Sequence, residues 1–481
     1  MMKSLCGPAV CLALIFAVLT GSGMRAEAAA LPIIKAQNQK FVDAAGRQVV
    51  LRGVNAGGRS KLPPFLPFEP VPDFSTALDR YVDAIAALGF NVVRLLVIYE
   101  AAEPVRGRYD EKYLAQYDRM VQAFAARGIY VIVDSHQDLF SRRFCGDGFP
   151  DWVVEEKYRD LPQRSSCKIW NLHYFTSPVL NSFDRLWSNS DGIQDSVAAF
   201  FKMLAERYQD EPAVLGFEPI NEPMPGGRGY LDYSGFHAEL YAFYEKVGDA
   251  VHSVAPRYII FADICALENT GTINPDRERP RVDNLALAPH YYDLGTFGVS
   301  LAPGGDQWLM DKGISRHRRL ASSWQVPVLL TEYGITPLSK DAPAYINKLF
   351  AVFDEHALSG TFWEASMSAT IVNYENTSLF EPDGTLRPRS VFLDRPYPRA
   401  VAGDIESFSF DPESALFELT WNESEAISSP TEIHLPARLY QQGTKIYLDP
   451  PGEFDFDVSA AVIKIFPLSK TIRRQARISP N

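Results

Sequence analysis

Residues 78–97 read LDRYVDAIAALGFNVVRLLV and contain one helix-to-strand unit. Apolar residues recur at helical spacing as far as Gly89, and a short run of mostly aliphatic residues follows. The first part is typical of an amphipathic helix and the second of a buried parallel strand. This unit predicts an α/β fold in which helices cover a sheet.

The same unit recurs along most of the chain. Eight strands in strand–helix alternation predict a (β/α)8 TIM barrel over residues 31–395. A doubly wound sheet is the competing architecture, but no GxGxxG turn follows the first strand. The eight apolar runs are VVLRGV (49–54), VVRLLV (92–97), VIVDS (131–135), VLGFE (214–218), IIFAD (259–263), LALAP (285–289), VLLTE (328–332) and GTFWEA (360–365).

Four segments depart from this alternation. FVDAAGRQVVLRGVN, at 41–55, predicts an N-terminal hairpin that leads into the first strand. Residues 396–481 show short alternating strands without helical period, which predicts a C-terminal antiparallel β-sandwich domain. Long loops at 61–74 and 136–190 follow strand ends on the face where barrel enzymes bind, so we expect them to bind substrate. The alternative for both loops is ordinary packing against the barrel rim.

The composition and the N-terminal residues indicate which partners and which cellular location to expect. The net charge of −12 does not favour a nucleic-acid partner. Residues 1–30 have an early Lys3, an apolar run too short to make a good membrane span, and small residues at the end. They predict a signal peptide cleaved near Ala28 or Ala30, and hence a secreted protein.

Three cysteines follow the predicted signal peptide. Cys145 and Cys167 lie in one long loop and are candidate disulfide partners in an oxidising compartment. Cys265 follows an apolar run and is expected to be a buried thiol. No CxxC motif or cluster of histidines accompanies these residues, so no metal site is expected.

Polar residues stand at the C-terminal ends of most predicted strands. A single such residue is often structural, but six strands that bring polar groups to one rim predict a substrate site. These residues are Arg94, His136, Gln137, Asp138, Asn221, Glu222, His290, Tyr291, Tyr292, Glu332, Tyr333, Trp363 and Glu364.

Glu222 and Glu332 are the central pair of this set. They are 110 residues apart, on predicted strands four and seven, and we expect them to face each other across the barrel mouth. Glycosidic bond cleavage needs two such carboxylates, one protonated and one ionised. Glu218 and Glu364 are expected to be structural, with Glu218 paired to Arg94 or another base.

The motifs INEP, LLTEYG, PHYY and FWEA resemble glycoside hydrolase family 5, a family of retaining (β/α)8 enzymes. The run HQDLFSRRFCGDGFPDW more specifically resembles the endoglycoceramidases (endoglycosylceramidases), which cleave between an oligosaccharide and ceramide. A trailing β-sandwich is also similar, so the resemblance covers nearly the whole chain after the signal peptide. One departure is Met224, where related enzymes often have an aromatic residue.

The resemblance implies a role for each matching residue. Glu222 would be the general acid/base and Glu332 the nucleophile. Asn221 would bind the sugar 2-hydroxyl, His290 and Tyr292 would orient Glu332, and Arg94 would support the carboxylates. The residues that would bind the sugar next to ceramide are Lys61, His136, Asp138 and Trp363. No metal or cofactor is implied.

We therefore expect a secreted, monomeric, retaining endo-β-glycosidase that hydrolyses glycosphingolipids at a membrane or micelle surface, releasing intact glycan and ceramide. Phe and Pro residues of the two long loops would then line an apolar slot, unless they are ordinary core. One rival is another family 5 β-glycosidase, such as an endoglucanase or a glucosylceramidase-like enzyme. Other rivals are a non-catalytic glycolipid-binding protein and an adhesin that acts through its sandwich.

Overall fold

The barrel strands lie close to the predicted runs. The computed structural model describes residues 30–160, 170–269, 271, 278–293, 305–335, 341–373, 375–440, 443–458 and 460–481. Residues 1–29 of the predicted signal peptide lie outside these ranges. The parallel sheet is formed by β4 (Arg52–Ala56), β5 (Val92–Val97), β6 (Tyr130–Ser135), β7 (Val214–Glu218), β8 (Ile259–Ala262), β9 (Leu285–Leu287), β10 (His290–Tyr291), β11 (Leu329–Tyr333) and β12 (Ser359–Phe362).

The sheet closes on itself. Its order is β10-β11-β12-β4-β5-β6-β7-β8-β9, and β9 and β10 are consecutive pieces of the segment 285–291. The amide of Leu287 donates to the carbonyl of Pro327 at 2.9 Å, which joins β9 to the segment before β11. The predicted (β/α)8 barrel is confirmed, with strand six split in two.

Five of the barrel helices begin at an aspartate whose carboxylate accepts a hydrogen bond from a backbone amide of the first turn, a favourable N-cap. The capping residues are Asp73, Asp110, Asp232, Asp306 and Asp341. The long helices are α1 (Phe74–Ala86), α3 (Glu111–Ala125), α5 (Ser177–Trp187), α6 (Ile193–Arg207), α8 (Tyr233–His252), α9 (Gln307–Trp324) and α10 (Ala342–Glu355). The short helices are α2 (Tyr99–Ala102), α4 (Glu156–Arg159), α7 (Gly226–Gly229) and α11 (Ala437–Tyr440). None of the described helices is long and apolar enough to span a membrane.

Two antiparallel sheets form the predicted C-terminal sandwich. One has the order β14 (Gly403–Asp411), β15 (Leu416–Glu423), β20 (Ile472–Pro480), β17 (Thr444–Asp449). The other has the order β1 (Ile34–Gln37), β2 (Lys40–Asp43), β3 (Gln48–Val49), β13 (Tyr397–Val401), β16 (Thr431–His434), β19 (Val462–Ile465), β18 (Phe454–Asp457). The N-terminal hairpin β2–β3 therefore extends a sheet of the sandwich.

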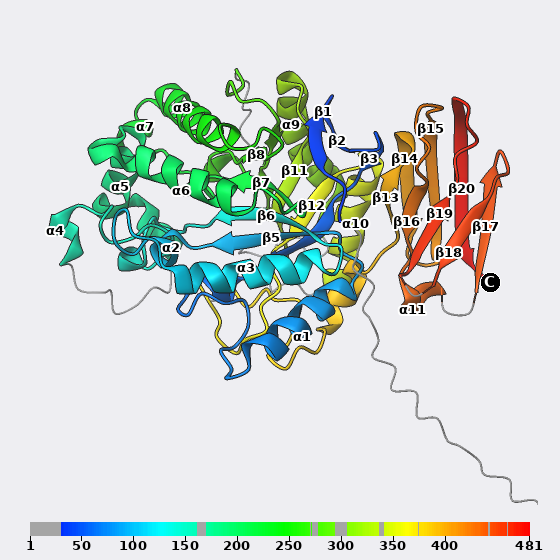
Figure 1. Cartoon of the computed structure of the whole chain (residues 1–481), viewed down its shortest axis with the longest axis horizontal. Helices are drawn as coiled ribbons and strands as arrows, with labels where there is room; N and C mark the ends of the chain where they lie inside the picture. Colours follow the sequence, from blue (N-terminus) through cyan, green and yellow to red (C-terminus); the bar gives the residue numbers. More distant parts are fainter. Residues whose placement is uncertain are drawn as a thin grey trace, which may run out of the picture.

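The same hairpin also packs against the barrel floor. Ile34, Phe41 and Val49 share a buried cluster with residues such as Ile132 and Ile259, which point into the N-terminal end of the barrel. In Figure 1 the sandwich lies beside β1–β3 and α10, whereas α4, α5 and α7 lie at the opposite end of the molecule. The strand ends that carry the predicted site are thus remote from the sandwich.

Candidate active site

Strand geometry brings the predicted polar residues together. All barrel strands are parallel, so residues at or just after their C-terminal ends reach the same rim. Direct contacts link six of the predicted residues there: Arg94, Asn221, Glu222, His290, Tyr292 and Glu332. Tyr333, also predicted at this rim, instead packs against Phe350 and Phe353 of α10. Most of the predicted residues are buried, and the Glu222 side chain is 19% exposed.

Glu222 and Glu332 form the centre of this group. Nδ1 of His290 lies 2.9 Å from Oε1 of Glu222 and 3.5 Å from Oε2 of Glu332. One ligand atom from each of the three side chains lies within 4.8 Å of the others, so both carboxylates lie beside the same imidazole nitrogen. The predicted pairing of the two glutamates across the barrel mouth is what the structure contains.

The two carboxylates have different hydrogen-bond partners. Glu332 accepts from Nη1 of Arg94 at 2.7 Å and from the hydroxyl of Tyr292 at 2.9 Å. These donors, one of them a cation, match an ionised carboxylate. Glu222 instead accepts from Nδ2 of Asn269 at 3.0 Å. Burial raises the pKa of Glu222 to about 7, so this carboxyl can hold a proton near neutral pH.

His290 lies closer to Glu222 than to Glu332, although the sequence predicted that it would orient Glu332. Burial lowers the pKa of His290 to about 3, so the imidazole is neutral. A neutral imidazole carries a single N–H and can either donate to Glu222 or accept its proton.

Arg94 links the carboxylates beneath the site. Its guanidinium makes a two-bond contact with Glu218 at 2.8 and 2.9 Å and donates to the side-chain oxygen of Asn221 at 2.8 Å. It also pairs with Asp134 at 3.1 Å. These contacts confirm that Glu218 is a buried partner of Arg94. The supporting role of Arg94 stays a prediction.

Asn221 is fixed at both ends of its amide. Its oxygen accepts from Arg94, and its nitrogen donates to the backbone carbonyl of Gln137 at 3.0 Å. Glu364 is similarly held, because it accepts from the amide of Gly58 at 2.6 Å and from the hydroxyl of Ser366 at 2.5 Å. Glu364 is therefore a structural carboxylate, as predicted.

The residues predicted to bind the sugar form one contact group. Nζ of Lys61 lies 2.5 Å from Asp138 and 4.4 Å from the centre of the Trp363 ring. The His136 ring is parallel to Trp363, with the ring centres 5.3 Å apart. Nδ1 of His136 bonds to Asp134 at 2.8 Å, and its buried Nε2 has no hydrogen-bond partner among the described residues.

Several residues near the site were not predicted from the sequence. Asn269 donates to Glu222, Asn373 donates to Asp138 at 3.1 Å, and Glu375 accepts from Nε1 of Trp363 at 3.0 Å. Asp263 accepts from the amide of Glu222 at 2.8 Å. Asp263 ends the apolar run IIFAD, so the strand-end rule could have found it, whereas the other three lie in loops without such a signal.

The long loops are mostly packed core. The side chains of Phe140, Phe144, Phe149, Phe183 and Trp187 are buried, as are Leu66 and Phe68 of the first loop. Most of the loop aromatics therefore do not line an open slot, because they fill the space between the loops and the barrel. Cys145 is disulfide-bonded, and its predicted partner Cys167 lies outside the described residues. Cys265 is buried, as predicted.

Two groups of acidic and histidine side chains have the spacing of metal ligands: Glu218, Asp263 and His290, and Glu222, His290 and Glu332. In each group one carboxylate, Glu218 or Glu332, is already neutralised by Arg94. In both groups the guanidinium of Arg94 therefore supplies a positive charge to one of the carboxylates.

Two family models match the chain. The model of cellulase (glycosyl hydrolase family 5) matches residues 42–368, which include most of the barrel. The model of the glycoside hydrolase family 5 C-terminal domain matches residues 395–479, the sandwich.

The chain is similar to endoglycoceramidases over most of its length. Endoglycoceramidase I of Rhodococcus hoagii is 28% identical over 434 residues, which cover 86% of this chain and 82% of that protein. The endoglycoceramidase of Cyanea nozakii is 28% identical over 444 residues, covering 85% and 84%. The structure of endo-glycoceramidase II from Rhodococcus sp. with ganglioside GM3 has a TM-score of 0.76 at 25% identity, covering 92% of this chain and 99% of that chain. A lactosyl-enzyme intermediate of the same enzyme is also similar.

Proposed function

The chain belongs to glycoside hydrolase family 5, and we propose that it is a secreted, retaining endo-β-glycosidase that cleaves glycosphingolipids between the oligosaccharide and ceramide. The observation that carries the proposal is the Glu222–Glu332 pair, whose carboxylate oxygens lie within 4.8 Å. Retaining enzymes hold such carboxyl groups about 5–5.5 Å apart and inverting enzymes about 6.5–9.5 Å. The distance supports the retaining course.

The chemistry follows from the two environments. Glu332 attacks the anomeric carbon while Glu222 gives its proton to the glycosidic oxygen, so that ceramide leaves as a neutral alcohol. The glycan is then bonded to Oε of Glu332. Glu222, now ionised, takes a proton from a water molecule, whose oxygen attacks the same carbon and releases the glycan. Arg94 and Tyr292 stabilise Glu332 whenever it carries a negative charge.

Exposed apolar side chains around the barrel mouth support a lipid substrate. Every strongly exposed large apolar residue of the barrel, in the described part of the chain, lies in a segment that follows the C-terminal end of a strand. Leu231 is 92% exposed and Trp308 is 65% exposed. Apolar side chains that gather on one face of a protein mark an interaction surface. These residues are Val71, Val105, Leu172, Phe175, Leu231, Leu267, Trp308, Leu309 and Ile371.

A comparison of three substrates tests the proposal. The purified enzyme is offered a ganglioside, glucosylceramide and cellulose at equal sugar concentration, with Glu332→Gln as the inactive control. The proposal expects rapid release of ceramide from the ganglioside alone. Faster cleavage of cellulose would make the protein an endoglucanase, and faster cleavage of glucosylceramide would make it an exo-acting enzyme.

Secretion and the monomeric state belong to the same proposal and have separate tests. The N-terminus of the protein recovered from the medium is expected to follow Ala28 or Ala30. Light scattering is expected to give the mass of one chain without its signal peptide. An intact N-terminus on cell-associated protein, or a dimer mass, would contradict these two points and leave the proposed reaction unaffected.

A further inference from the structure

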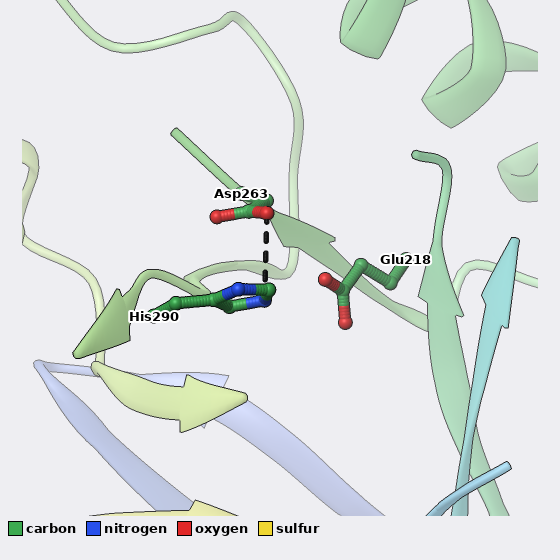
Figure 2. Close-up of side chains that lie close together, drawn as sticks. All are labelled: Glu218, Asp263 and His290. Carbon is green, nitrogen blue, oxygen red and sulfur yellow. Dashed lines mark ion pairs between the residues drawn. The ribbon is translucent and has the colours of Figure 1, made fainter. Parts of the chain in front are cut away.

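Asp263 is a buried carboxylate that touches both the backbone of Glu222 and the ring of His290. It follows β8 and is 1% exposed. One of its oxygens accepts from the amide of Ile264 at 2.7 Å. The other accepts from the amide of Glu222 at 2.8 Å and lies 3.6 Å from Nε2 of His290. Figure 2 shows Asp263 and the His290 ring facing each other, with Glu218 to one side.

The contact between Asp263 and the Glu222 amide stabilises an unusual backbone conformation of Glu222. Glu222 has a φ of 43°, in the left-handed region that non-glycine residues seldom adopt. Such a conformation persists only where the surroundings hold it. The Asp263 carboxylate holds it, because it accepts from the amide of that residue. Asp263 thereby helps to set the direction of the Glu222 side chain.

The contact with His290 affects which ring nitrogen of His290 carries the proton. His290 is neutral and has one N–H to place on either of its two nitrogens. Burial raises the pKa of Asp263, but two backbone amides donate to its oxygens, and such bonds favour the carboxylate. When the His290 N–H is on Nε2, it lies beside this carboxylate, 3.6 Å from Nε2, and Nδ1 is left as an acceptor 2.9 Å from Glu222. An acceptor at this distance favours the protonated form of Glu222, which is the form that a general acid needs.

The other charged groups near His290 do not supply this effect. Glu332 and Glu218 are each paired with Arg94, whereas Asp263 pairs with no lysine or arginine in the described part of the chain and lies 3.6 Å from the neutral His290 ring. Lys61 and Asp138 pair with each other on the sugar side. The titratable and charged groups around His290 are Glu218, Glu222, Asp263, Glu332, Arg94 and Tyr292, with Lys61, Asp138, His136 and His317 beyond them.

We infer that Asp263 is a positioning residue for the acid/base step, which holds the backbone of Glu222 and selects the His290 tautomer that keeps the proton on Glu222. The inference rests on the acid/base role proposed for Glu222. Asp263 thus favours the state before proton transfer and does not touch the substrate.

Leaving-group dependence separates this role from a merely structural one. Asp263→Asn keeps the size of the side chain and one acceptor but removes the charge. On an aryl β-lactoside with a poor leaving group, its kcat/KM is expected to fall about 10–100-fold, because proton donation is impaired. On a dinitrophenyl β-lactoside, whose leaving group needs no proton, the loss is expected to stay within about threefold. The basic limb of the pH profile is expected to move about one unit toward lower pH, since a negative charge near Glu222 is lost.

A matched control is Asp354→Asn. Asp354 is also a buried carboxylate, but it pairs with Arg52 at 3.1 Å away from the site. Its substitution is expected to change kcat/KM for both aryl substrates by the same factor and to leave the basic limb of the pH profile unmoved. An equal loss on both substrates in Asp263→Asn, or an unmoved limb, would overturn the inference.

If Asp263→Asn fails to fold, the tautomer of His290 can still be measured by NMR in the wild-type protein. Imidazole ¹⁵N shifts of the wild-type protein, assigned with His290→Gln, are expected to place the proton on Nε2 below pH 6. A proton on Nδ1 in that range would refute the inference. Both measurements use soluble aryl glycosides or no substrate. A wild-type enzyme that cleaved aryl lactosides but not glycolipids would therefore contradict the proposed substrate without touching the role of Asp263.

Discussion

Glu222 and Glu332 both approach Nδ1 of His290, at 2.9 and 3.5 Å, and of the two only Glu332 contacts Arg94. This difference separates two chemically identical side chains. The carboxylate beside the guanidinium is suited to remain ionised and attack, whereas the buried carboxyl beside a neutral imidazole is suited to carry a proton.

Replacement of the nucleophile is expected to abolish turnover but to preserve substrate binding. Glu332→Gln keeps the hydrogen bond from Tyr292 but cannot form the glycosyl-enzyme bond, so kcat is expected to fall about 10⁴-fold or more. Calorimetric binding of a glycolipid headgroup is expected to change by less than tenfold. Activity within tenfold of wild type would show that Glu332 is not the nucleophile.

Replacement of the acid/base has a different signature. Glu222→Ala is expected to lose about 10²–10⁴-fold on a glycolipid, but much less on a dinitrophenyl glycoside, where no proton is needed for departure. Added azide is expected to restore turnover of that substrate and to give a β-glycosyl azide, detected by mass spectrometry and NMR. An α-azide would contradict the covalent intermediate, because azide would then have attacked the free glycoside.

The pH profile reports on Glu222. Burial raises its pKa to about 7, and the protonated form is the active one. We therefore expect kcat/KM for a glycolipid to fall above pH 7, by about tenfold for each further unit. In Glu222→Gln, assayed with a dinitrophenyl glycoside, this falling limb should disappear. A wild-type profile that stays level to pH 9 would be inconsistent with the assigned acid.

The disulfide of Cys145 can be mapped directly. Mass spectrometry of a non-reduced digest is expected to yield a peptide pair that joins Cys145 to Cys167. Cys145→Ser is expected to destabilise the loop after β6 and to lower the free energy of unfolding by about 2–4 kcal/mol, measured by chemical denaturation. Cys265→Ser serves as the control that removes a thiol but no bridge. A peptide linking Cys145 to another cysteine would contradict the predicted pairing.

Sequence patterns predicted the barrel because each strand and helix has a local signature. The run VVRLLV became β5 over the same residues, 92–97, since a strand buried on both faces is apolar throughout. The pairing of β3 with β13 was not predicted, although both regions were expected to form strands. Residues 48–49 and 400–401 are far apart in sequence, and partner choice depends on packing that no local pattern records.

The site was predictable to the extent that it uses strand ends. Arg94, His136, Glu222 and Glu332 follow one rule, because parallel strands deliver their C-terminal residues to one rim. Asn269 and Glu375 lie on loops without regular periodicity, so nothing in the sequence placed them near Glu222 and Trp363. The position of His290 between the glutamates also depends on side-chain directions that residue types do not specify.

The products of the reaction show which glycosidic bond the enzyme cleaves. A mixed pool of glycosphingolipids is treated with wild-type enzyme and, in parallel, with Glu332→Gln, and both the water-soluble and lipid products are identified by mass spectrometry. We expect intact oligosaccharides with a free reducing end, together with unglycosylated ceramide, in the wild-type reaction only. Release of single monosaccharides that leaves shortened glycolipids, with no free ceramide, would contradict it.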